Sequence, residues 1–174
     1  TVLFWIVLSV FGSIPFLLFG FGVIDSFFES MSGITTTGAT VINGLDDLPK
    51  SLLIYRQLLQ WLGGMGLIVL AIAVMPLLGI GGGQLFKTQT PGPMSEQRLT
   101  PRITSTARAL WSIYFVLTVL CIFAYRLAGM NNFDAVSHAF STVSIGGFST
   151  HDLSIGFFNS LSVEIVCITF MLLS

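Results

Sequence analysis

Charged side chains are scarce in this sequence. Lys, Arg, Asp and Glu make up 9% of the 174 residues, whereas hydrophobic residues make up 53%. Because soluble domains carry about 25% charged residues, this composition excludes an ordinary soluble domain and favours a membrane protein. The net charge of −1 gives no basis for binding nucleic acid, which needs a strongly basic surface.

The residue groups that catalysis requires are also missing. The sequence shows no nucleophile–base pair, metal-ligand cluster or phosphate-binding loop, so we expect no enzymatic activity and no covalent cofactor. Its two cysteines, Cys121 and Cys167, fall in apolar segments, where buried packing is more usual than a disulfide. His138, His151 and Asp152 lack the compact spacing of metal ligands. We interpret His138 as a hydrogen-bonded buried residue, and the His151–Asp152 pair as bonded to its surroundings or facing water.

Four apolar blocks approach or exceed the roughly 20 residues that span a bilayer: 2–20, 51–78, 109–128 and 156–174, the last of them incomplete. The chain begins and ends inside such blocks and shows no signal-peptide pattern before residue 20, which indicates a fragment. Four of the seven basic residues lie between the second and third blocks: Lys87, Arg98, Arg102 and Arg108. The positive-inside rule therefore predicts that the linker 79–105 is cytoplasmic.

Two small, polar stretches stand out among the apolar blocks, "MSGITTTGATVING" at 31–44 and "STVSIGGFSTHD" at 141–152. Each follows a short apolar segment, 25–35 or 134–144, that is too short to cross a bilayer. Such segments are typical of re-entrant helices, which enter the membrane and return on the same side. We expect both on the outer side, with Asp25 and Asp134 as the helix N-caps.

The two stretches belong to an internal repeat. A shift of 109 positions superposes Gly20 on Gly129, Asp25 on Asp134, Ser32 on Ser141 and Gly38 on Gly147. Both copies have the order span, glycine, short helix, polar turn, span, so the repeat is parallel and not inverted. The predicted units are 1–78 and 106–174, joined by the linker 79–105, with a third helix that starts near 101.

A polar turn at membrane depth needs a reason, because unpaired backbone groups in hydrocarbon cost several kcal/mol. One reason is a cation path, in which inward-facing carbonyls replace the hydration shell of the ion. Glycine suits such a turn because it adopts positive φ without steric penalty. The alternative is an ordinary glycine turn between two helices.

The words "SMSGITTTGAT", "YRQLLQWLGGMG", "TPGPM", "TPRI" and "STVSIGGFSTHD" closely resemble the TrkH/TrkG branch of the Trk/Ktr/HKT potassium transporters, over the whole chain. The resemblance implies an all-α membrane protein with tandem helix–pore loop–helix repeats similar to a potassium channel pore. Family members carry four repeats around one pore, and these residues match the first two. The implied function is potassium uptake across the bacterial cytoplasmic (inner) membrane.

The resemblance also implies particular site residues. Gly38 matches the filter glycine of the first repeat, and Gly147, followed by Phe148, matches that of the second. The implied ion-binding residues are Thr36, Thr37, Gly38, Ile145, Gly146 and Gly147, with Thr35, Ala39, Thr40, Ser144 and Phe148 as filter support. Because the family filter lacks the full two-glycine channel signature, we expect weak discrimination among potassium, rubidium and sodium.

Partners are implied in the same way. They are membrane lipid, the remaining two repeats of a longer chain, a second copy in a homodimer, and a cytosolic nucleotide-binding ring that docks on surfaces such as 79–105. Potassium is the only implied ligand, and no other metal is expected.

Several residues allow two interpretations. Glu29, an acid at membrane depth, is either functional or paired with Arg56 or Lys50. Asp46, Asp47 and Asp152 either concentrate cations at an entrance or are simply solvated. The glycines of 61–66 form either a gating hinge or a close helix contact. Arg98, Arg102 and Arg108 either contact the ring or lipid or only orient the chain.

Two other functions stay open. A secondary transporter coupled to protons or sodium would need a paired ionisable site, for which Glu29 and Glu164 are the candidates. A non-conducting membrane subunit that assembles partners would use its helix surfaces and not the turns.

Overall fold

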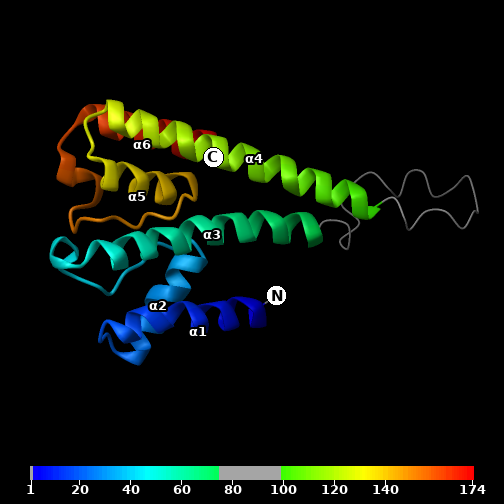
Figure 1. The fold of residues 1–174 in the computed structure, drawn as a ribbon, viewed down its shortest axis with the longest axis horizontal. Coiled ribbons are helices and arrows are strands. Elements are labelled where there is room, and N and C mark those ends of the chain that lie inside the picture. The colour runs from blue at the N-terminus through cyan, green and yellow to red at the C-terminus, as the bar shows by residue number, and fades with distance from the viewer. Residues whose placement is uncertain (1, 75–98) are drawn as a thin grey trace, which may run out of the picture.

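The computed structural model of the chain describes residues 2–74 and 99–174, and within these ranges it is helical without β-strands (Figure 1). The first half contains α1 (Val2–Leu18), α2 (Val23–Ile34), the 3₁₀ turn η1 (Leu45–Asp47) and α3 (Lys50–Val74). The second half contains α4 (Leu99–Leu127), α5 (Asn132–Val143), the 3₁₀ turn η2 (Ser154–Phe158) and α6 (Leu161–Leu173).

The two short helices enter the bundle from one end, and the chain after each returns to that end (Figure 1). α2 packs against α1 and α3, and α5 packs against α4, α3 and α6. Each has 12 residues, which at about 1.5 Å per residue is far shorter than a hydrocarbon core of about 30 Å. Both segments therefore form a short helix after which the chain returns to the same end of the bundle, as predicted. That they enter a membrane stays a prediction.

Backbone geometry repeats at the same 109-residue offset as the sequence. α1 and α4 are both followed by a left-handed glycine, Gly20 (φ 94°) and Gly129 (φ 104°). The N–H of the next residue donates to the carbonyl five positions earlier, at 3.2 Å in the first copy and 3.1 Å in the second. This is the Schellman pattern, which satisfies carbonyls at a helix end. The two halves thus place their short helices by the same turn.

Polar and apolar residues are distributed inside-out relative to a soluble protein. Large exposed apolar side chains cover the outer faces of three helices: Leu3, Phe4, Phe11 and Leu18 on α1, Ile113, Phe115, Phe123 and Leu127 on α4, and Leu161, Ile168 and Leu172 on α6. Fully buried polar residues lie inside: Ser9, Glu29, Ser30, Arg56, Gln57, Gln60 and Ser137. A soluble protein rarely exposes such a surface, and a hydrocarbon environment explains it.

Thr106–Leu127 is the one helical segment, among the residues searched, with the length and hydropathy of a full span, at a mean hydropathy of 1.9. Val2–Leu18 and Leu161–Leu173 are shorter apolar helices. Cys121 and Cys167 are both free thiols, as predicted. Most of the predicted linker, 79–98, lies outside the described residues, together with Lys87 and Arg98.

Two predicted helix starts are wrong. Gly22 and not Asp25 is the N-cap of α2, and Asn131 and not Asp134 is the N-cap of α5. The Asn131 side chain accepts a hydrogen bond from the Asp134 backbone N–H at 2.9 Å. Both acids instead lie in the first helical turn, where they still face the positive end of the helix dipole. α4 starts at Leu99, close to the predicted start near 101, and Pro101 lies in its first turn.

The glycines of α3 allow close packing, as the second interpretation of 61–66 predicts. A Cβ built on Gly63 would overlap the Ile34 carbonyl oxygen at the end of α2. A Cβ on Gly64 would lie 2.9 Å from the Tyr114 hydroxyl oxygen and 3.1 Å from the Ser144 Cβ. α3 therefore contacts the ends of both short helices through surfaces that have no side chain.

This packing predicts a difference between two glycines of one helix. Gly63→Ala is expected to lower the free energy of unfolding of the full-length protein by about 1–3 kcal/mol, because the new methyl group overlaps backbone. Gly66→Ala is the matched control, since its Cβ would meet only Trp5 at 3.7 Å. Thermal unfolding in detergent measures both. Equal melting temperatures for the two variants would contradict the close contact.

Candidate functional site

The polar turns that follow α2 and α5 have the same backbone hydrogen bonds at equivalent positions. Three N–H groups in each turn donate to the last carbonyls of the preceding helix. In the first repeat these bonds are Thr35 to Met31, Thr36 to Gly33 and Thr37 to Ser32; in the second they are Ser144 to Phe140, Ile145 to Thr142 and Gly146 to Ser141. All six distances lie between 2.8 and 3.2 Å. The helices therefore define how both turns begin.

Backbone φ alternates in sign along both turns. Positive values occur at Thr36 (55°) and Gly38 (75°), and at the equivalent Ile145 (53°) and Gly147 (85°). In an extended strand successive carbonyls face opposite sides, whereas alternation of left-handed and right-handed residues brings them onto one side. Thr and Ile rarely adopt positive φ because they are β-branched, so the conformation is strained at those positions. Strain of this kind is concentrated at functional sites.

The two turns lie against one another. A Cβ built on Gly38 would overlap the Gly146 carbonyl oxygen and lie 3.5 Å from the Gly147 Cα. A Cβ on Gly146 would overlap the Gln60 side chain, whereas one on Gly147 would meet nothing within 4 Å. Glycine is thus required at 38 by both space and backbone conformation and at 147 by backbone conformation, whereas a side chain at 146 would displace the Gln60 amide.

A cavity of about 270 Å³ adjoins the beginning of both turns. Thr36 and Ile145 line it, together with Gly64 of α3, Tyr114 of α4 and Ser144. The equivalent residues Thr36 and Ile145 therefore face one cavity, which has room for several water molecules. A hydrated cation could approach the turns from this side.

A buried ion pair stands behind the first turn. Arg56 of α3 and Glu29 of α2 are both 0% exposed, and the Arg56 Nη2 lies 2.6 Å from the Glu29 Oε1. The Glu29 carboxylate also accepts the Thr40 hydroxyl at 2.9 Å and the Val41 N–H at 3.3 Å. The structure thus decides between the two predicted partners, because Lys50 lies instead over the Phe133 ring, 5.4 Å from its centroid.

Arg56 also reaches the second turn. Its Nη1 donates to the Ser149 carbonyl at 3.2 Å, and its guanidinium lies over the Phe148 ring at 4.4 Å from the centroid. One helical turn further along α3, the Gln60 Oε1 accepts the Phe148 N–H at 3.1 Å. Sequence reasoning missed these links between repeats. The available signals were a charged and an amide side chain four residues apart within an apolar block.

His138 occupies in the second repeat the position of Glu29 in the first. Its Nε2 lies 2.9 Å from the Ser149 Oγ, and Ser149 is equivalent to Thr40. Its Nδ1 lies 2.9 Å from the Asp134 carbonyl oxygen. The interpretation of His138 as a satisfied buried residue is confirmed, and the same contact holds the outer part of each turn to its own short helix.

The outer loops of the two repeats are also joined. The Asp152 carboxylate accepts the N–H groups of Gly44 and Leu45, both at 3.1 Å. His151 hydrogen-bonds Asp46 and lies 3.3 Å from the Asp134 carboxylate. The hydrogen bond with His151 lowers the pKa of Asp46 below its usual value. His151 and Asp152 therefore bond their surroundings, as one of their two interpretations predicts.

The predicted filter residues thus come together in space. Thr36 to Gly38 and Ile145 to Gly147 form adjacent turns. Of the support residues, Thr35 and Ser144 begin the turns, whereas Ala39, Thr40 and Phe148 lie behind them. The Ala39 carbonyl accepts the Ser32 hydroxyl at 2.6 Å, Thr40 contacts Glu29 and Arg56, and Phe148 is buried. That the carbonyls bind an ion stays a prediction.

Comparisons with known proteins agree over the length of the chain. The family model for TrkH, a cation transport protein, matches residues 1–174. The chain is 59% identical over 175 residues to the Trk system potassium uptake protein TrkH of Halomonas elongata, and 52% identical over 176 residues to TrkH of Escherichia coli. These alignments cover 99% of the chain and 36% of each relative, so the chain spans about a third of their length.

A solved structure shows the same fold. The crystal structure of the potassium transporter TrkH from Vibrio parahaemolyticus superposes with a TM-score of 0.84 at 54% identity, covering 99% of this chain and 34% of that one.

The loop contact of Asp46 predicts a pH-dependent effect. Because the pKa of Asp46 is lowered from 3.8, its contribution to stability is present above that pH and disappears as the pH falls through the folded-state pKa. Asp46→Asn in the full-length protein is therefore expected to melt below the parent at neutral pH, with a gap that closes in acid. Asp47→Asn, a neighbouring acid in η1, is the control. The same gap in both variants would argue against the His151 contact.

Proposed function

This chain belongs to the TrkH family of cation transport proteins, and on that premise we propose that it supplies two repeats of a potassium uptake pore. The pair of adjacent turns carries the proposal. They have matching hydrogen bonds and positive φ at equivalent positions, inside a protein whose outer surface is apolar. In this proposal the carbonyls of 36–38 and 145–147 replace the water around a potassium ion.

A pore must compensate the free energy that a potassium ion loses when it leaves water. A bare cation in a medium of low dielectric constant is unfavourable by tens of kcal/mol. Carbonyl dipoles held in place by the short helices compensate this penalty without reorganising as the ion enters. The C-terminal ends of α2 and α5 lead directly into the turns. Each such end carries about −0.5 of an elementary charge, which favours a nearby cation.

The positions of Glu29 and Glu164 fit passive movement of the ion better than coupled transport. Glu29 is committed to Arg56, and Glu164 is exposed in the first turn of α6. The two acids that a coupled transporter would need are therefore not arranged as a shared ionisable site. We propose that the protein performs no covalent chemistry and that potassium is its only ligand.

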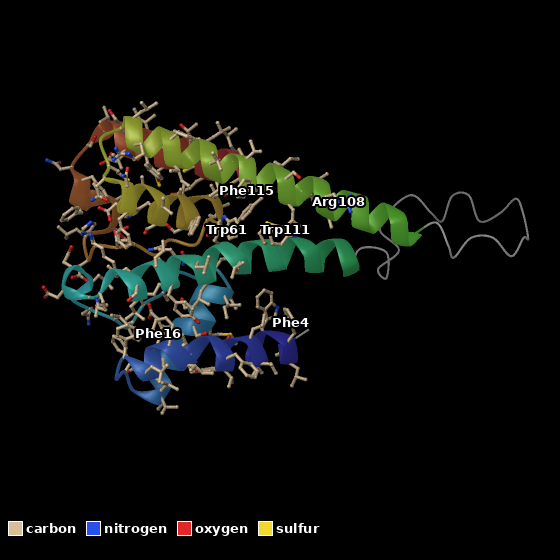
Figure 2. All side chains as sticks on the ribbon, viewed as in Figure 1. Phe4, Phe16, Trp61, Arg108, Trp111 and Phe115 are labelled. Carbon is tan, nitrogen blue, oxygen red and sulfur yellow. The ribbon has the colours of Figure 1, made fainter. Side chains whose placement is uncertain are left out.

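The proposed pore needs more than this chain. Two turns enclose only part of an ion path, and the relatives are about three times longer, so we propose that two further repeats of the same protein complete the pore. We further propose that the complete protein forms a homodimer in the inner membrane, with the turns facing outward. A cytosolic nucleotide-binding ring would dock on the linker 79–105. Arg108, near the linker end of α4 and remote from the turns, suits that orientation (Figure 2).

Two glycines with the same backbone constraint separate conduction from folding. Gly147 and Gly129 both have positive φ, and a Cβ on either meets nothing within 4 Å. Alanine at either position therefore carries a similar conformational penalty of about 1–2 kcal/mol. Gly147→Ala is expected to reduce rubidium uptake by liposomes containing the full-length protein by about tenfold, because relief of the strain turns a carbonyl away from the ion path. Gly129→Ala is expected to retain uptake.

The measurement is rubidium tracer influx, with folded protein in each sample quantified by gel filtration. Normal uptake by both variants would place the ion path elsewhere and favour an assembly subunit. Equal loss in both would attribute the effect to backbone strain and not to the filter.

A further inference from the structure

We propose that Arg56 is a positioning residue that sets the relative position of the two filter turns, so that ion selectivity depends on its guanidinium group. The proposal rests on the proposed function of the turns. It assigns to one side chain of the first repeat a role in the filter of both repeats.

The contacts of Arg56 join equivalent points. Its Nη2 donates to the Thr40 Oγ1 at 2.9 Å, and its Nη1 donates to the Ser149 carbonyl at 3.2 Å. Thr40 and Ser149 each lie two residues after the filter glycine of their repeat. The Nε donates to the Glu29 Oε1 at 2.8 Å, which fixes the plane of the group. A rigid fork of five donors is suited to holding three partners at once.

Gln60 supports the same arrangement. It lies four residues after Arg56 and therefore on the same face of α3. Its Oε1 accepts the Phe148 N–H at 3.1 Å, and its side chain occupies the space beside Gly146. α3 of the first repeat thus contacts the second turn from residue 146 to residue 149. α3 thus contacts Phe148 twice, at its backbone N–H through the Gln60 amide and at its ring through the Arg56 guanidinium.

The second repeat lacks an equivalent group. At the 109-residue offset, Ile165 stands in place of Arg56 and Thr169 in place of Gln60. His138 stands in place of Glu29 and contacts Ser149 of its own repeat. Within the described residues, the guanidinium link is therefore made once, from the first repeat to the second.

A contribution to stability alone does not explain why a buried Arg56–Glu29 ion pair lies between the two turns. A buried ion pair often contributes little to stability compared with apolar residues of the same volume, whereas removal of one partner is strongly destabilising. A selective site, by contrast, needs its ligands held within about 0.5 Å. A fully buried pair that hydrogen-bonds both turns provides this positioning.

The test compares three variants of the full-length protein in liposomes, with rubidium influx measured in the presence and absence of excess sodium. Arg56→Lys keeps a charge opposite Glu29, but its compact ammonium cannot reproduce the geometry of the fork. The double variant Glu29→Gln/Arg56→Met removes both charges, and its Gln still accepts hydrogen bonds from Thr40 and Val41. Lys50→Met removes the other cation of α3 and is the control.

We expect Arg56→Lys and the double variant to fold and to lose rubidium-over-sodium preference by about tenfold, equivalent to about 1.4 kcal/mol. Lys50→Met is expected to keep the parental preference. Parental selectivity in folded Arg56→Lys and in the folded double variant would overturn the proposal. Failure of both to fold would also overturn it, since Arg56 would then be required for the fold and not for selectivity.

The outcome is separable from that of the proposed function. If Gly147→Ala conducts like the parent, the turns are not the ion path, whatever Arg56 does. If Gly147→Ala is impaired while the Arg56 variants keep selectivity, the filter assignment stands and only the role of Arg56 is rejected.

Discussion

Non-helical backbone inside an apolar medium must have every polar group satisfied, and the rest of this structure depends on that constraint. Two chain segments leave their short helices inside the helix bundle and return as turns. Each turn starts with N–H groups bonded to the last carbonyls of its short helix. Because these bonds use the N–H groups, the carbonyls of the turns remain as the available acceptors. A segment built this way favours a cation over an anion.

The same constraint explains why the interior is polar and crowded. Behind the first turn the acceptor is a carboxylate, Glu29, which requires a counter-charge at 0% exposure and finds it in Arg56. Behind the second turn the equivalent residue, His138, contacts Ser149 without a guanidinium. The two repeats therefore hold the outer part of the turn to the short helix in different ways, with an ion pair in the first repeat and a hydrogen bond between His138 and Ser149 in the second. Of these two arrangements, only the ion pair contacts the neighbouring repeat, through the bond from Arg56 to the Ser149 carbonyl.

The contact between the two repeats is made by large aromatic side chains of α3 and α4. Trp61 of α3 lies against α4, with its ring 6.4 Å from that of Trp111 and its Nε1 donating to the Thr118 hydroxyl at 3.0 Å (Figure 2). Tyr114 returns a hydrogen bond to the Trp61 carbonyl at 3.0 Å. Together with Arg56, these contacts place α3 between its own short helix and that of the next repeat.

Much of this arrangement was predictable because it is local. Block lengths, the polar turns and the 109-residue offset identified the re-entrant helices within two residues of their bounds. The N-caps were missed because Asp in a first turn and Asp at an N-cap produce the same sequence pattern. In α5 the two are distinguished by the hydrogen bond that the Asp134 N–H donates to the Asn131 side chain, and in α2 the N-cap is Gly22, which makes no side-chain bond. Contacts such as Gly44 to Asp152 join residues 108 positions apart, and no spacing rule reports them. Likewise, the sequence left open whether Glu29 was functional or paired with Arg56 or Lys50, and only the three-dimensional contacts identify Arg56 as its partner.

Thr36 and Ile145 are β-branched residues at positive φ, a conformation that glycine adopts more easily. A β-branched residue at positive φ is unfavourable by about 1–2 kcal/mol, and glycine would avoid that penalty. Each of these residues donates its N–H to the preceding helix at 3.0 Å, a bond with a net value of about 0.5–1.5 kcal/mol. The hydrogen bond offsets part of this penalty, and the left-handed conformation is retained at both positions. One glycine of positive φ in each turn, Gly38 or Gly147, then suffices to maintain the alternation, and the side chains at 36 and 145 remain available to shape the cavity that they line.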